Sequence, residues 1–144
     1  MCPICGTVED ANHIFFSCYT AQFLWSCFRE TVGGQWCNTN FPDLFVEIHA
    51  SAPRHCHIRR LYIEVLAWTL WTVRNKLVIQ KVPLRRATDS IFKMCGYLQL
   101  WRPLSRPQDQ DAINTLLTDL CSMAFRVALL PLEHCVGFPL KRKG

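Results

Sequence analysis

The first eighteen residues, MCPICGTVEDANHIFFSC (1–18), decide how this chain begins its fold. Two residues separate Cys2 from Cys5, and this gap lets two thiolates of one tight turn face the same metal ion. His13 and Cys18 form a second pair further along. Four soft or borderline ligands without a carboxylate predict a closed tetrahedral site for a zinc ion (Zn2+), which is the structural kind. Such a site keeps no open position for a catalytic water.

The second ligand pair sets a geometric condition. In an uninterrupted α-helix, positions five apart point about 140° away from each other. His13 and Cys18 therefore converge on one ion only if a helix starts or distorts between them, and we predict that it does. The alternative interpretation is a free pair, Cys2 and Cys5, near a frayed end, with His13 an ordinary surface residue.

Behind this stretch, the hydrophobic periodicity is helical. Apolar residues recur at steps of three and four from about residue 17 to residue 29, and a Gly-Gly pair at 33–34 predicts the stop. Residues 35–55 mix Asn, Pro and Ser with a short apolar patch, so we expect a linker containing about one helical turn.

Three more helices are expected further on. The first, 56–80, is apolar on two faces and should lie between neighbours. The second, 88–101, has a one-sided stripe, a capping residue in Thr88 or Asp89, and Pro103 after its end. A linker over 102–110 precedes the last helix, from about 109–111 to 130–131. The fold class is therefore mainly α, a small zinc knuckle followed by about four helices, with units at 1–34, 35–55, 56–101, 102–110, 111–131 and a basic tail at 132–144.

The charge distribution is uneven along the chain. Residues 1–53 hold one base against five acids, whereas residues 54–93 hold nine bases against two. Phosphate neutralisation supplies most of the affinity of a nucleic-acid module, so RNA or DNA should meet the middle of the chain or the basic tail and avoid the knuckle. The candidate contacts are Arg54, Arg59, Arg60, Arg85 and Arg86. The alternative is a solvated cationic face without a ligand.

Aromatic residues raise two further questions. Phe15, Phe16 and Tyr19 could stack on bases, but at helical spacing beside a metal such residues more often belong to the core. Trp71 and Arg74 lie three apart on one predicted helix, so we expect a cation–π pair that makes Arg74 a packing residue.

Nine cysteines and no signal-peptide pattern favour metal binding and buried thiols over a disulfide scaffold, so we expect an intracellular protein, nuclear or cytoplasmic. The longest uncharged stretch near the middle, 65–73, is too short to span a bilayer, which predicts no membrane partner. No phosphate loop, nucleophile elbow or useful carboxylate pair is present. We therefore expect neither an enzyme nor a small-molecule substrate.

Two blocks of the sequence resemble a known family. The first is Cys-Pro-Ile-Cys-Gly (2–6), Glu9, Asn-His-Ile-Phe-Phe-Ser-Cys (12–18), Ala21 and Trp25, and the second is Ala-Trp-Thr-Leu-Trp-Thr-Val-Arg-Asn-Lys (67–76). In this order they resemble the zinc-binding domain C-terminal to the reverse transcriptase of plant LINE-type, non-LTR retrotransposons. The family normally has several tens of residues before the first cysteine, and nothing here resembles the polymerase aspartates or an endonuclease.

The resemblance implies a non-catalytic zinc-binding module of retrotransposon origin that binds nucleic acid. The alternative is a protein-interaction or structural remnant, whose exposed apolar helix surface once packed against missing parts of a polymerase. Only 19% of the residues are charged, a composition that leaves apolar surface for such a partner.

Overall fold

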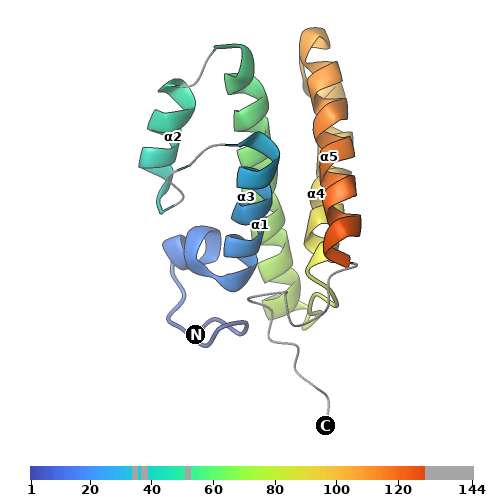
Figure 1. Ribbon diagram of the computed structural model, residues 1–144. Helices are drawn as coiled ribbons and strands as arrows, with labels where there is room; N and C mark the ends of the chain where they lie inside the picture. The colour runs from blue at the N-terminus through green and yellow to red at the C-terminus, as the bar shows by residue number, and fades with distance from the viewer. Residues whose placement is uncertain (34–35, 37–38, 51–52, 129–144) are drawn as a thin grey trace.

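The computed structural model describes residues 1–33, 36, 39–50 and 53–128, and these residues are mainly α-helical (Figure 1). A π-helical turn, η1 (His13–Ser17), leads into α1 (Tyr19–Val32). α2 (Phe41–Ala50) and the long α3 (Pro53–Ile79) follow. α4 (Thr88–Trp101) connects through two short 3-10 turns, η2 (Arg102–Leu104) and η3 (Pro107–Asp109), to α5 (Gln110–Ala128). The expected fold class, mainly α with an N-terminal Cys/His cluster, is confirmed.

α3 is the central element. It packs against η1, α1 and α2 on one side and against α4 on the other, while α5 lies antiparallel to α4 (Figure 1). Its inner positions, including Tyr62, Leu66 and Leu70, are buried, as expected for a helix between neighbours. Trp68, which the helical period places on the same face as Tyr62 and Val65, is 46% exposed. The reason is that α2 and α4 leave part of α3 uncovered.

The buried residues form one core that joins α1, α3, α4 and α5. Phe28 of α1 stacks on Tyr62 of α3 with ring centroids 4.9 Å apart, and Trp25 stacks on Phe16 at 5.6 Å. Each of these large side chains is almost fully buried and contributes on the order of 2–3 kcal/mol through apolar burial. The knuckle and first helix, expected as a unit over 1–34, therefore share a core with the rest.

The linker expected over 35–55 is corrected by the structure, because ten of its residues form α2. Asn40 accepts a hydrogen bond from the backbone N–H of Asp43 (2.9 Å) and so caps the helix, and Pro42 fits the first turn. Leu44 and Ile48, one turn apart, are buried against the core. Tertiary burial thus extends the single predicted turn into a helix.

The other helix boundaries agree within a few residues with the expectation. At the start of α4, the Asp89 carboxylate accepts the backbone N–H of Arg86 (3.1 Å), so Asp89 and not Thr88 supplies the cap-like contact. The expected end of the last helix at 130–131 and the basic tail at 132–144 lie outside the described residues.

Candidate metal centre

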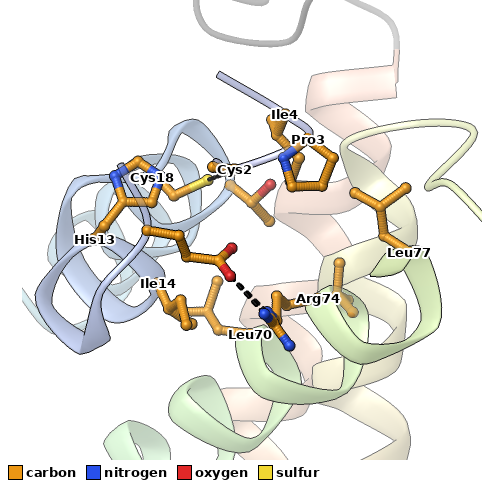
Figure 2. Close-up of a pocket in the computed structure, with 12 residues that line it drawn as sticks. Cys2, Pro3, Ile4, His13, Ile14, Cys18, Leu70, Arg74 and Leu77 are labelled. Carbon is orange, nitrogen blue, oxygen red and sulfur yellow. Dashed lines mark hydrogen bonds and ion pairs between the residues drawn. The ribbon is translucent and has the colours of Figure 1, made fainter. Parts of the chain in front are cut away.

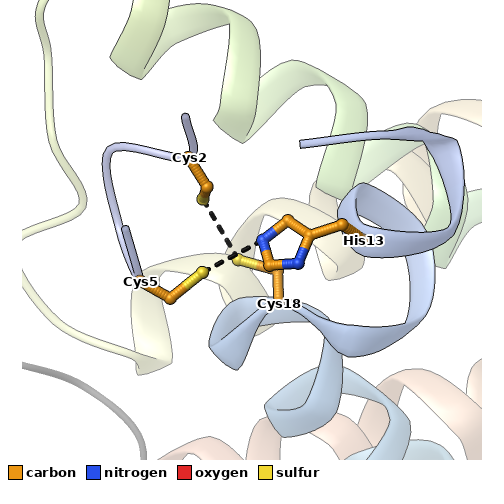
Figure 3. A group of neighbouring side chains, drawn as sticks. All are labelled: Cys2, Cys5, His13 and Cys18. Carbon is orange, nitrogen blue, oxygen red and sulfur yellow. Dashed lines mark hydrogen bonds between the residues drawn. The ribbon is translucent and has the colours of Figure 1, made fainter. Parts of the chain in front are cut away.

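The structure brings together all four predicted ligands. One ligand atom from each of Cys2, Cys5, His13 and Cys18 lies within 4.8 Å of the others (Figure 3). The sulfur atoms of Cys2 and Cys18 are 3.8 Å apart, and Cys5 Sγ lies 3.0 Å from His13 Nε2. Cys2, His13 and Cys18 are buried, and Cys5 is half-buried. The arrangement can hold one metal ion, closed on all four sides by protein ligands.

The first two ligands are presented by a tight backbone turn. The N–H of Gly6 donates to the carbonyl of Cys2 (2.9 Å), and the N–H of Cys2 donates to the carbonyl of Thr7 (2.8 Å). Gly6 has φ +73°, a left-handed conformation that a side chain disfavours. The turn therefore directs both thiols toward the same point and depends on glycine at position 6.

The second two ligands converge because the helix between them is distorted, as the sequence predicted. The N–H of Cys18 donates to the carbonyl of His13 (2.8 Å), five residues back, so the turn His13–Ser17 is π-helical. Cys18 itself is extended, with ψ 148°, and α1 starts after it. The Asp10 carboxylate accepts the N–H of His13 (2.7 Å) and fixes the start of the turn.

Hydroxyl groups surround the ligands. Thr7 Oγ1 lies 3.2 Å from Cys5 Sγ and 3.3 Å from His13 Nδ1, and Ser17 Oγ lies 3.4 Å from the same nitrogen. When Nε2 binds an ion, Nδ1 is the nitrogen left to carry the proton, and these oxygens lie where they can accept it and orient the ring. Sequence reasoning missed Thr7 and Ser17, although hydroxyls within a few residues of ligands are the signal that could have found them.

The protonation chemistry of the cluster favours a cation. Burial raises the pKa of the Cys18 thiol to about 12, and the neighbouring Cys2 and Cys5 add to this effect. Burial also acts to raise the pKa of Cys5, but hydrogen bonds from Thr7, Cys2 and Cys18 outweigh it, so the Cys5 pKa lies below its usual value. Three sulfur atoms this close cannot all become thiolates without a compensating positive charge.

The centre rests on the last turns of α3 (Figure 2). Leu70, Val73 and Leu77 face Cys2 and Pro3 across a small apolar cavity of about 20 Å³. Arg74 donates through Nε to the Glu9 carboxylate (3.1 Å), a bond that ties the loop between the ligand pairs to α3. The Arg74 guanidinium also lies 5.8 Å from the ring centre of Trp71, so the predicted cation–π pair is confirmed.

The predicted nucleic-acid contacts do not form one surface. Arg59 lies in the first third of α3, where its guanidinium is 5.0 Å from the Trp36 ring centre, and Arg60 pairs with Glu64 at 2.9 Å. Arg85 and Arg86 are exposed beyond the other end of the helix. About 30 Å of helix separates the two groups, at 1.5 Å per residue. The Arg54 side chain lies outside the described residues.

The knuckle aromatics divide between core and surface. Phe16 is buried, and Phe15 is half-buried against Phe41 at 5.3 Å between ring centroids. The Trp25 indole N–H donates to the carbonyl of Phe15 (2.7 Å). Tyr19 is 41% exposed. Two of the three aromatic residues are thus used for packing.

No known family model, curated protein or solved structure matches this chain. Within the described part of the chain, no helix has the length and apolar character needed to cross a membrane.

Proposed function

We propose that this chain is a non-catalytic module in which a structural zinc ion fixes the N-terminal segment to α3, and in which the turn after α3 binds RNA or DNA. The module derives, in this proposal, from the region C-terminal to a LINE-type reverse transcriptase, on the two sequence blocks described above. The observation that carries the binding role is a concentration of exposed cations at the end of the helix that the metal centre supports.

The ligand types support zinc as the metal, and the distance between two of the sulfur atoms is compatible with it. In a regular tetrahedron with zinc–sulfur bonds of about 2.3 Å, two sulfur atoms are about 3.8 Å apart. The sulfur atoms of Cys2 and Cys18 lie at 3.8 Å. Three thiolates and one imidazole suit zinc better than magnesium or calcium, which prefer oxygen ligands. Since every position is taken by a side chain, the ion acts in folding and leaves no coordination site for a substrate.

The binding surface is a basic turn between α3 and α4, made of Lys76, Lys81, Arg85, Arg86 and Lys93. All but Lys93, which is half-buried, are exposed. Residues 76–93 contain one acid, Asp89. None of the ion pairs found among the described residues involves these five cations. A phosphate backbone would supply the missing counter-charge.

Two of these cations also repel each other. The pKa of Lys93 lies below its usual value because of burial and because Lys76 lies beside it. A neighbouring ammonium group disfavours the charged form, and a bound phosphate would relieve this repulsion. The metal centre contributes by holding the last turns of α3, from which Lys76 projects.

The test is a salt titration of zinc-loaded protein with labelled single-stranded RNA and duplex DNA. Replacing Lys81, Arg85 and Arg86 by Gln should weaken binding roughly tenfold or more at low salt and reduce the salt slope by about two to three. The matched control replaces Arg59 and Arg60 by Gln, and we expect a smaller effect because Trp36 and Glu64 already engage these side chains. Equal losses in both variants, or no salt-dependent binding at all, would contradict the basic turn as the binding surface.

A second function, protein interaction, is favoured by a separate feature. An open apolar groove of about 420 Å³ lies over α3, bounded by Phe41 and Phe45 of α2 and by Trp101 of α4. Its floor includes Trp68 and Trp71, which are 46% and 40% exposed. Exposed apolar patches of this kind mark protein interfaces. Replacing Trp68 by Gln should then abolish partner binding while leaving nucleic-acid affinity unchanged.

A further inference from the structure

A second pair of cysteines lies far from the metal ligands, on the seam between α4 and α5. The sulfur atoms of Cys95 and Cys121 are 3.8 Å apart. Cys95 is 5% exposed, and Cys121 is half-buried. Within the described part of the chain, the only cluster of three or more possible metal ligands is the N-terminal one, so this pair has no further ligand beside it.

The helix register holds the two thiols opposite each other. α4 and α5 run antiparallel, and contacts flank the thiol pair on both sides. Phe92, three residues before Cys95, packs edge-on against Phe125, four residues after Cys121, with ring centroids 6.1 Å apart. On the other side, Arg102 donates to the side-chain oxygen of Asn114 (2.7 Å). The Phe92–Phe125 contact lies about one helical turn from the thiol pair, and the contact of Arg102, which follows α4 in η2, lies about two turns away on the other side, so all three contacts fit one antiparallel register.

This register matters because it limits how the thiols can move. Helices packed along a continuous seam do not slide by a residue without breaking the flanking contacts. A sulfur–sulfur distance of 3.8 Å is a van der Waals contact, and small side-chain and backbone adjustments would bring it toward the bond length of about 2.05 Å. The packing of α4 against α5 therefore holds the two sulfur atoms close together before any oxidation.

From this geometry we infer that Cys95 and Cys121 form a redox-sensitive dithiol, which a hydroperoxide oxidises to a disulfide that joins α4 to α5. Cys121 reacts first because solvent reaches it. Its thiolate attacks the peroxide oxygen, the O–O bond breaks, and a sulfenic acid and an alcohol, or water, are formed once the leaving oxygen takes up a proton. Cys95 then attacks the sulfenic sulfur, the S–S bond forms, and water leaves.

The overall reaction is balanced. Two thiols lose two electrons and two protons, and the hydroperoxide takes up both as it is reduced to an alcohol, or water, and a second water. The two cysteines differ in burial in a way that suits these roles. Burial, together with the nearby Cys121, raises the pKa of Cys95 to about 12, so Cys95 is a protonated thiol at neutral pH and the more accessible Cys121 is the first to react.

The experiment uses the full chain loaded with zinc, so that the N-terminal thiolates are coordinated. The protein is treated with hydrogen peroxide, free thiols are alkylated after denaturation, and the peptides are identified by mass spectrometry. We expect the peptides with Cys95 and Cys121 to be joined and lighter by two hydrogen atoms. The oxidised protein should also unfold at a higher urea concentration than the reduced protein.

Two variants control the result, and circular dichroism verifies that each retains its helices. Cys121→Ser should lose both the cross-link and the shift in the unfolding midpoint. Cys56→Ser removes another half-buried thiol, and should keep both. If Cys95 and Cys121 are both alkylated after peroxide treatment in folded protein, or if other cysteines cross-link equally well, the inference is overturned. Sulfenic acid trapped at Cys121 without a cross-link would overturn it as well.

Discussion

The N-terminal segment and the α4–α5 hairpin place cysteines at similar distances but are held together by different forces. In both, two sulfur atoms lie 3.8 Å apart. In the first, a turn and a distorted helix gather four side chains that can hold one metal ion. In the second, two long helices already share an apolar seam, and the thiols add little to it. The two pairs therefore differ in whether further ligands among the described residues lie beside them and not in burial, because Cys2, Cys18 and Cys95 are all buried in the same core.

The largest expected effect breaks the first region only. Cys18→Ser removes a buried ligand, so zinc affinity should fall by orders of magnitude, and residues 1–18 should lose their hydrogen-exchange protection. Metal content measured by atomic absorption and exchange followed by mass spectrometry test this prediction. Protection in α5 should stay close to that of the parent protein. An equal loss in both regions would contradict the conclusion that the N-terminal segment and the α4–α5 hairpin are stabilised by different interactions.

The converse substitution targets the hairpin. Leu120 is fully buried on α5, so Leu120→Ala should lower the free energy of unfolding by about 2–5 kcal/mol. Urea denaturation of the metal-loaded protein measures this loss. The control is Thr118→Ala on the exposed side of the same helix, which should change stability by less than about 1 kcal/mol. Zinc content should remain one ion per chain in both variants.

The pH dependence of stability sharpens the comparison. Burial raises the pKa of Cys18 and of Cys95 from 9.0 to about 12. A raised thiol pKa favours folding below pH 9 and loses that contribution as pH rises toward 12, at most about 1.4 kcal/mol per pH unit for each group. A zinc ion would bind Cys18 as a thiolate, so Cys18 would no longer contribute to the pH dependence of the free energy of unfolding. The contribution of Cys95 would remain.

Urea unfolding of zinc-loaded protein between about pH 8 and 10.5 measures this difference. Stability should fall with pH, and Cys95→Ala should flatten the curve. Cys27, buried on α1 with its pKa also raised to about 12 by burial, contributes in the same direction. A curve that is already flat for the zinc-loaded parent protein would show that the buried helix thiols do not titrate in this way.

The smallest expected effect concerns the ion pair between Glu9, in the loop that joins the two ligand pairs, and Arg74 of α3. Glu9→Gln keeps the shape of the side chain but removes the charge that pairs with Arg74. Because both groups are partly exposed, we expect a loss of about 1 kcal/mol. Urea denaturation at low and high salt checks it, since the difference between parent and variant should shrink as salt rises.

The sequence allowed the metal ligands to be predicted because their chemistry is local. Two cysteines in one turn and a mandatory distortion between His13 and Cys18 follow from residue spacing alone, and the π-helical turn agrees. The Trp71–Arg74 pair was also predictable, since three residues on a helix fix the distance. The contact of Arg74 with Glu9 was not, because it joins residues far apart in the chain.

The failures have the same origin. The sequence of α2 predicts a linker because it is poor in helix signals. Packing of Leu44 and Ile48 against the core stabilises the helix. The arginines were grouped by sequence proximity, but α3 carries Arg59 and Arg60 to one end and the chain returns with Arg85 and Arg86 at the other. Charge counted along a chain does not show how a long helix spreads it in space.

The wide turn between His13 and Cys18 has a consequence for everything that follows it. The N–H of Cys18 closes the turn on the carbonyl of His13, and Cys18 itself is extended, so α1 begins as a new helix at a point that the end of the turn sets. With α1 started at this point, Trp25 and Phe28 are buried in the core. An ion bound by Cys2, Cys5, His13 and Cys18 would hold the end of the turn in place and, with it, the first residue of α1. Deleting one residue from the π-helical turn should then expose both aromatic side chains to water.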